Sequence, residues 1–157
     1  MLAVALLMAA QAPETEDWWY LTACCELGQQ QAFYADRASI RRDGDMALVE
    51  EAREGERSDE QDIIGARLLV RYDCRSRTSQ VMRYTFLLAN GARWTAPRHQ
   101  EQAEVVEAGS VKESTIRFAC GEGDGLEQLG TLGIREQALL LFRDRAEHLR
   151  ANPGAAH

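Results

Sequence analysis

The stretch that most constrains the fold runs from Ile63 to Leu88, where apolar and polar side chains alternate along two long segments. The even positions are mainly apolar and the odd positions mainly polar: Ile64, Ala66, Leu68, Val70, Tyr72, Cys74, Met82, Tyr84, Phe86 and Leu88 against Arg67, Arg71, Asp73, Arg83 and Thr85. Successive side chains of a strand point to opposite faces. The alternation therefore predicts a β-hairpin with one apolar face and one polar face.

The rest of the chain adds shorter strands and one helix. Strands are predicted over residues 18–25, 31–36, 46–54, 93–96 and 114–120, the last because Ile116, Phe118 and Cys120 keep the parity of the hairpin. Residues 134–150 predict an amphipathic helix, whose apolar positions are Ala138, Leu139, Phe142, Ala146 and Leu149.

A chain of 157 residues forms one domain. We therefore predict an α+β fold: an antiparallel β-sheet of about six strands, with the C-terminal helix packed on its apolar face. The expected domain spans residues 18–150, and a disordered tail is expected over residues 151–157.

The N-terminal residues predict export. The first ten, MLAVALLMAA, are wholly apolar but too few to span a bilayer, and Ala10-Gln11-Ala12 fits a cleavage site. We expect a signal peptide over residues 1–12, no transmembrane helix in the mature chain, and a periplasmic or outer-surface location. The alternative is a buried N-terminal strand. The segment from Leu21 to Cys24 also matches a lipobox, which would make Cys24 a lipid anchor, but acidic residues separate it from the apolar run.

Four cysteines in an exported chain indicate disulfides, with three possible connectivities. Cys74 and Cys120 share the inward parity of their predicted strands, so a bridge between them is favoured. Cys24 and Cys25 are neighbours, which rarely pair, and one of them is expected to be a free thiol or an intermolecular link. A metal site is disfavoured because the sequence has no C-x-x-C motif and only three histidines, and no cofactor is expected.

Charge bears on the class of partner. The net charge of −7 argues against a nucleic-acid partner. Four odd-parity arginines are predicted to share the outer face of the sheet as a cationic patch for carboxylate, sulfate or phosphate groups: Arg67, Arg71, Arg83 and Arg117. The alternative is that acids such as Asp73 or Glu113 neutralise them as ordinary surface pairs.

Motifs for catalysis are not found in the sequence. His99 and His148 are isolated, and the segment from Gly121 to Gly125 resembles a phosphate loop but lacks its lysine and carries two acids. Glu50 and Glu51 are adjacent on a predicted strand and so point to opposite faces. The chain is therefore not expected to be an enzyme.

Three short motifs resemble the surface-adhesin protein E-like family. They are Tyr34-Ala35-Asp36 with Ser39-Ile40 and Gly44, then Tyr72-Asp73-Cys74-Arg75, then Ala108-Gly109-Ser110-Val111 leading to Phe118-Ala119-Cys120. The resemblance covers about residues 18–120, with Ala108 where the family has proline. It implies a small antiparallel sheet with a C-terminal helix beside it, a bridge between Cys74 and Cys120, and an exported protein of Gram-negative bacteria.

Together these features predict an exported, non-enzymatic binding or adhesion module. Its partners are expected to be host or envelope proteins or anionic surfaces. The alternative function is a periplasmic accessory protein that binds a partner protein or a small ligand.

Overall fold

The expected hairpin is present and lies near one edge of the sheet. In the computed structural model, which describes residues 16–57, 59–97 and 102–152, it consists of β5 (Ile63–Asp73) and β6 (Thr78–Leu88). The two strands pair antiparallel from Ile63 opposite Leu88 to Asp73 opposite Thr78. The Asp73 carboxylate closes the turn by accepting hydrogen bonds from the backbone N–H groups of Arg75 and Ser76, both at 2.9 Å.

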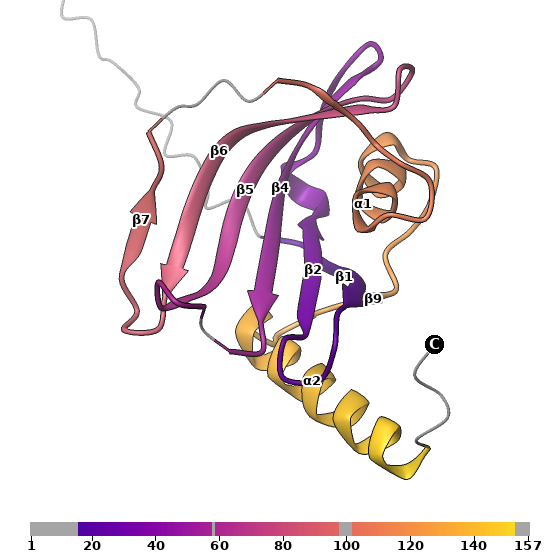
Figure 1. The fold of residues 1–157 in the computed structure, drawn as a ribbon. Coiled ribbons are helices and arrows are strands. Elements are labelled where there is room, and N and C mark those ends of the chain that lie inside the picture. Colours follow the sequence, from indigo (N-terminus) through magenta and orange to yellow (C-terminus); the bar gives the residue numbers. More distant parts are fainter. Residues whose placement is uncertain (1–15, 58, 98–101, 153–157) are drawn as a thin grey trace, which may run out of the picture.

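The sheet has nine strands, more than the six expected. Its main path is β7-β6-β5-β4-β2-β1-β9, and β3 pairs with β4 while β8 pairs with β6 (Figure 1). The remaining strands are β1 (Trp18–Cys24), β2 (Gln31–Asp36), β3 (Arg41–Asp43), β4 (Met46–Gly55), β7 (Arg93–Thr95), β8 (Glu104–Val105) and β9 (Glu127–Gln128). A 3-10 turn, Arg37–Ser39, follows β2. The strands that the sequence did not indicate have two or three residues each, too few for an alternating pattern to be visible.

The predicted strand over residues 114–120 is wrong, because this segment forms the last seven of the ten residues of helix α1 (Val111–Cys120). Ser110 caps the helix by accepting a hydrogen bond from the Glu113 N–H at 3.3 Å, and the Glu113 carboxylate accepts one from the Gly109 N–H at 2.6 Å. Gly121 ends the helix in the left-handed region, with φ +75°. The S-x-x-E capping pattern was the signal that distinguishes this helix from a strand.

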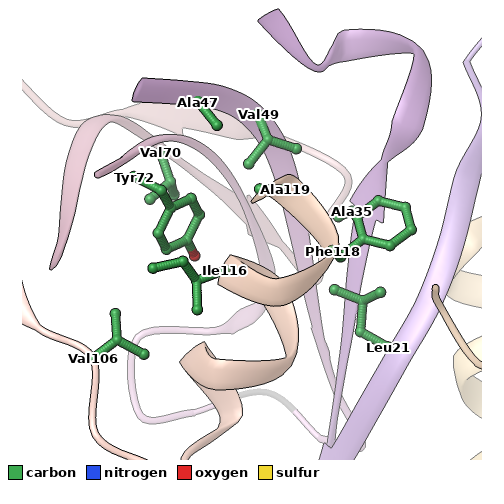
Figure 2. Packing of buried hydrophobic residues seen from close by; sticks show 10 residues of the cluster. All are labelled: Leu21, Ala35, Ala47, Val49, Val70, Tyr72, Val106, Ile116, Phe118 and Ala119. Carbon is green, nitrogen blue, oxygen red and sulfur yellow. The ribbon is translucent and has the colours of Figure 1, made fainter. Parts of the chain in front are cut away.

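Helix α1 covers one face of the sheet. Ile116, Phe118 and Ala119 face the sheet residues Val49, Val70 and Tyr72 in a shared hydrophobic core (Figure 2). Ile116 and Ala119 are fully buried, and Phe118 is nearly so. This is the face that carries the even-numbered apolar residues of β5.

Helix α2 (Ile134–Ala151) packs on the opposite face. Its Ala138 and Phe142 join Ala32 and Tyr34 of β2 and Ala52 of β4 in a second core. The C-terminal helix was expected on the apolar side of the hairpin, and that expectation is wrong because α1 already occupies that side. Leu139, expected to be buried, is 46% exposed.

The structure joins Cys74 to Cys120, with the Cα atoms 5.7 Å apart. Cys74 follows β5 directly and Cys120 is the last residue of α1. The bridge therefore ties the turn end of the β5–β6 hairpin to the helix that covers it. Although the expected partners meet, Cys120 reaches Cys74 from a helix and not from a neighbouring strand.

Cys24 and Cys25 form a disulfide with each other. The structure pairs these two neighbours with each other and has no free cysteine, which corrects the expected free thiol or intermolecular link. Cys25 has a φ of +81°, in the left-handed region that non-glycine residues seldom adopt. The pair lies where β1 leads into the β1–β2 connection, and Arg145 of α2 donates hydrogen bonds to the carbonyl oxygens of both residues.

The N-terminal expectations lie mostly outside the described residues. Residues 1–12, expected as a signal peptide, are among those not described, as is most of the expected tail; Ala151, its first residue, ends α2. The lipobox alternative is different, because lipidation at Cys24 would require cleavage before it. Such cleavage would remove residues 18–23 of β1, including Leu21, which is 5% exposed in the core under α1.

Replacing Phe142 with alanine is expected to destabilise the fold by about 3 kcal/mol or more, since the change removes a large side chain from the second core. Phe142 is 3% exposed. Chemical denaturation of the wild type and the variant measures the loss. Leu139→Ala, on the exposed side of the same helix, is the matched control and should change the free energy of unfolding little. Equal effects of the two substitutions would contradict the described docking of α2.

Removing the Cys74–Cys120 bridge is expected to cost about 4 kcal/mol in the chain-entropy account of a loop closed over 46 residues. Peptide mapping of the non-reduced protein by mass spectrometry should show Cys74 linked to Cys120 and no link from either to Cys24 or Cys25. Denaturation of a Cys74→Ser, Cys120→Ser double variant then gives the energetic contribution. A crossed linkage would contradict the described connectivity.

Candidate binding surface on the outer half of the sheet

Three of the four predicted arginines lie on one face of the β5–β6 hairpin. The pairing of Leu69 with Arg83, of Arg67 with Thr85 and of Arg71 with Gln80 places their side chains on the side of the sheet where α2 packs. Figure 1 shows that α2 lies beneath β1, β2 and the end of β4, away from β6 and β7. We call this surface the arginine face: Arg67, Arg71, Arg83 and Arg93.

The fourth member differs from the expectation. Arg117 lies on α1, on the other side of the sheet, because the segment that carries it is a helix and not a strand. Arg93 of β7 takes its place on the arginine face, since Arg93 pairs with Leu87 two residues from the Thr85–Thr95 pair. The hydroxyl oxygens of Thr85 and Thr95 are 2.9 Å apart, which fixes β7 against β6 on this side. Arg93 was missed because its strand is only three residues long.

Acids of β4 partly neutralise the arginine face. Glu54, which is 1% exposed, accepts a hydrogen bond from Arg67 at 2.9 Å and lies 3.5 Å from Arg135 of α2. Glu50 pairs with Arg83 at 2.5 Å. Arg71 is exposed, donates a hydrogen bond to the Gln80 side chain, and has no ion pair among the described residues. With Asp73, which lies on the same side of β5, three acids stand against the four arginines, so the face keeps an excess of positive charge.

Neither of the acids named from the sequence pairs with these arginines. Asp73 holds the hairpin turn, and Glu113 caps α1 and lies 3.9 Å from Arg77. The acids that pair are Glu50 and Glu54, which lie four residues apart on the same face of β4. These ion pairs could not be predicted from the sequence, because they depend on the register between β4 and β5.

The aromatic residues of β6 and β7 form a surface that the sequence did not indicate. Tyr84, Phe86 and Trp94 lie on the side of the sheet where α1 packs, but outside the α1 core. The alternation had placed Tyr84 and Phe86 on a buried apolar face. They are instead partly exposed, because α1 covers the other end of that face.

Glu51 lies on the opposite face of β4 from Glu50, as its adjacent position predicted. It accepts a hydrogen bond from the Tyr72 hydroxyl at 2.5 Å beside the α1 core. Burial raises the pKa of Glu51 from 4.5 to about 7. A raised carboxyl pKa can mark an acid–base catalyst, but this group faces the sheet–helix interface and its hydrogen-bond partner is a core tyrosine. We interpret it as a structural carboxyl group.

A cleft of about 470 Å³ lies beside the C-terminal end of α1, lined by Arg37, Ile40, Arg42, Phe118 and Gly121 to Asp124. Its cations already have partners. Arg37 pairs with Asp124 at 2.8 Å and stacks over Trp19, and Arg42 donates hydrogen bonds to the Ala119 carbonyl oxygen. The glycine-rich segment that resembled a phosphate loop forms one wall, and its two acids keep this wall unsuited to a phosphate.

The described residues contain no cluster of three or more histidine, cysteine or acidic side chains able to hold a metal ion. Within the same residues, none of the helices has both the length and the apolar character needed to cross a membrane.

A family model described as "Surface-adhesin protein E" matches residues 18–121. The chain belongs to the surface-adhesin protein E family. The match covers the central sheet and α1 and ends just after the Cys74–Cys120 bridge, whereas α2 lies outside it. No curated protein and no solved structure matches the chain. Membership in a family of surface adhesins is consistent with a binding module at the cell surface, which directs attention to the exposed faces of the sheet.

The Glu51 carboxyl group predicts a pH dependence of stability. The folded state holds the Glu51 proton more tightly than the unfolded state, since its folded pKa of about 7 is above the ordinary 4.5. The wild type should therefore lose stability relative to Glu51→Gln as the pH rises from about 4.5 through 7, and the difference should level off above that range. Melting temperatures of both proteins from pH 4 to 9 measure this. A constant difference across the range would contradict the assignment.

Proposed function

We propose that the protein is an exported, non-enzymatic binding module that acts at the outer cell surface. The family supports a surface adhesin, and the apolar N-terminal run and the two disulfides support passage into an oxidising compartment. The arginine face is proposed as the contact surface for anionic groups of host or envelope proteins or of an anionic surface.

The observation that carries this proposal is the uneven charge of the arginine face. Four guanidinium groups lie on it, while the acids described on this side of the strands are Glu50 and Glu54 of β4 and Asp73, whose carboxylate is turned into the hairpin turn. A guanidinium group presents its N–H donors in a planar fork that fits carboxylate, sulfate or phosphate. The protein as a whole has a net charge of −7 and repels anions. A local excess of positive charge on the arginine face therefore directs anionic partners to this surface.

The second candidate is a periplasmic accessory protein that binds a partner protein or a small ligand. The same fold and disulfides suit it, so the location separates the two functions. Proteolysis of intact bacteria, followed by detection of the protein, should degrade a surface protein and leave a periplasmic one intact. Protection equal to that of a known periplasmic protein would contradict the adhesin proposal.

The arginine face is tested with the double variant Arg71→Glu, Arg83→Glu. We expect it to lose most of its binding to dextran sulfate and to polyglutamate, and we expect wild-type binding to weaken as salt is added. Isothermal titration or surface plasmon resonance measures both.

The matched control is Arg117→Glu, Arg143→Glu, which changes the net charge equally on the two helices. Its binding should stay close to that of the wild type. The double variant Arg71→Gln, Arg83→Gln adds no carboxylate beside Glu50. It therefore removes the positive charges with less risk that the protein misfolds. Equal binding by the wild type and both arginine-face variants would contradict the proposed role of this face.

A further inference from the structure

A row of side chains crosses the sheet on the face opposite to the arginines. Phe33, Arg53, Ala66, Phe86 and Trp94 are successive cross-strand partners from β2 to β7. Partners of this kind project to the same face of a sheet. None of the five belongs to the core beneath α1, so the row runs beside the helix and not under it.

Two stacked rings form the outer end of this row, and a third ring lies beside them. Phe86 and Trp94 are stacked, with ring centroids 5.4 Å apart and planes at 15°. Tyr84, two residues before Phe86 on the same face of β6, has its ring centroid 4.6 Å from that of Phe86, with the two planes tilted by 32°. Trp94 is nonetheless 53% exposed. The stack therefore leaves an aromatic surface in contact with solvent at the edge of the sheet.

Arg53 places a cation on the same row. It is partly exposed, and within the described residues its side chain has neither a hydrogen bond nor an ion pair, in contrast to Arg67 and Arg83 on the other face. At a strand spacing of about 4.8 Å, it lies on the order of 14 Å from Trp94, three strands away. A ligand that contacts both must therefore be extended and made of several units.

We propose that this aromatic row binds a carboxylate-bearing polysaccharide. The faces of the aromatic rings are electron-rich and attract the polarised C–H groups on the flat side of a sugar ring. The guanidinium group of Arg53 pairs with a carboxylate further along the same glycan chain. Exposed aromatic rings and, within the described residues of the row, one arginine without an ion pair together match the apolar ring faces and the carboxylates of an acidic sugar chain.

An extended peptide fits the same surface less well. Peptides that bind to sheets commonly add a strand to a free edge, and their affinity comes from backbone hydrogen bonds. Here β7 is the edge beside the rings, but it has only three residues, and the backbone of β6 at residues 85–87 is already paired with it. A short edge of this kind offers few backbone groups, so the exposed rings must provide most of the contact.

This site is separate from the arginine face, because the two surfaces lie on opposite sides of the sheet. Arg93 and Trp94 are adjacent in β7 and project to opposite sides, which provides a matched pair of variants. Failure of one proposal can thus be distinguished from failure of the other.

The experiment is a titration of the full chain with polygalacturonate and with hyaluronate at about 0.15 M salt, where long-range attraction is screened. Trp94→Ala should weaken binding by about tenfold or more, the loss expected for one stacked ring, and Trp94→Phe should retain part of it. Arg53→Gln should abolish the preference for polygalacturonate over its methyl ester. Arg93→Gln and the double variant Arg71→Glu, Arg83→Glu should bind the uncharged methyl ester as the wild type does, whereas Trp94→Ala should weaken that binding as well.

Circular dichroism and thermal melting establish that each variant is folded. Wild-type protein that binds neither polysaccharide would overturn the proposal, as would affinity unchanged by Trp94→Ala. Binding to polyglutamate that is as tight as binding to polygalacturonate, and that Trp94→Ala abolishes equally, would assign the row to an acidic peptide instead.

Discussion

The packing of α1 against the even-numbered residues of β5 decides how the rest of the molecule is arranged. The apolar side of the hairpin buries Val70 and Tyr72 under Ile116 and Phe118, and the Cys74–Cys120 bridge fixes the helix at the end of that strand. Because α1 is only ten residues long, it covers one end of the face and leaves Tyr84, Phe86 and Trp94 outside the core. Because that side is taken, α2 packs on the opposite face, over β2 and β4.

How far the sequence could be interpreted depended on the length of each pattern. The two strands of eleven residues carried enough alternation to predict both their pairing and their faces, and α2 was long enough to show a helical period. The segment from Ser114 to Cys120 was too short to distinguish the strand period of two residues from the helical period of about 3.6. Its apolar residues fit a strand at Ile116, Phe118 and Cys120, and its buried residues fit a helix at Thr115, Ile116, Phe118 and Ala119. Only the capping pattern at Ser110 and Glu113 distinguished them.

The surfaces were less predictable than the strands, because they depend on register between segments far apart in the chain. The grouping of Arg67, Arg71 and Arg83 followed from parity alone, whereas the acids Glu50 and Glu54 could be matched to them only once β4 was aligned with β5. Trp94 joined Phe86 through a strand of three residues that has no pattern of its own. The sheet is thereby left with a cationic face and an aromatic face on its outer half, as suits a binding module of the surface-adhesin protein E family.

The claim that the outer half of the sheet is the binding surface is tested most directly by amide chemical-shift mapping of the labelled protein during titration with an anionic polysaccharide. The account predicts that shifts concentrate in β4, β5, β6 and β7, while α1, α2 and the cleft between Arg42 and Asp124 stay unchanged. Shifts concentrated in the helices or around that cleft, with β6 and β7 unaffected, would contradict it.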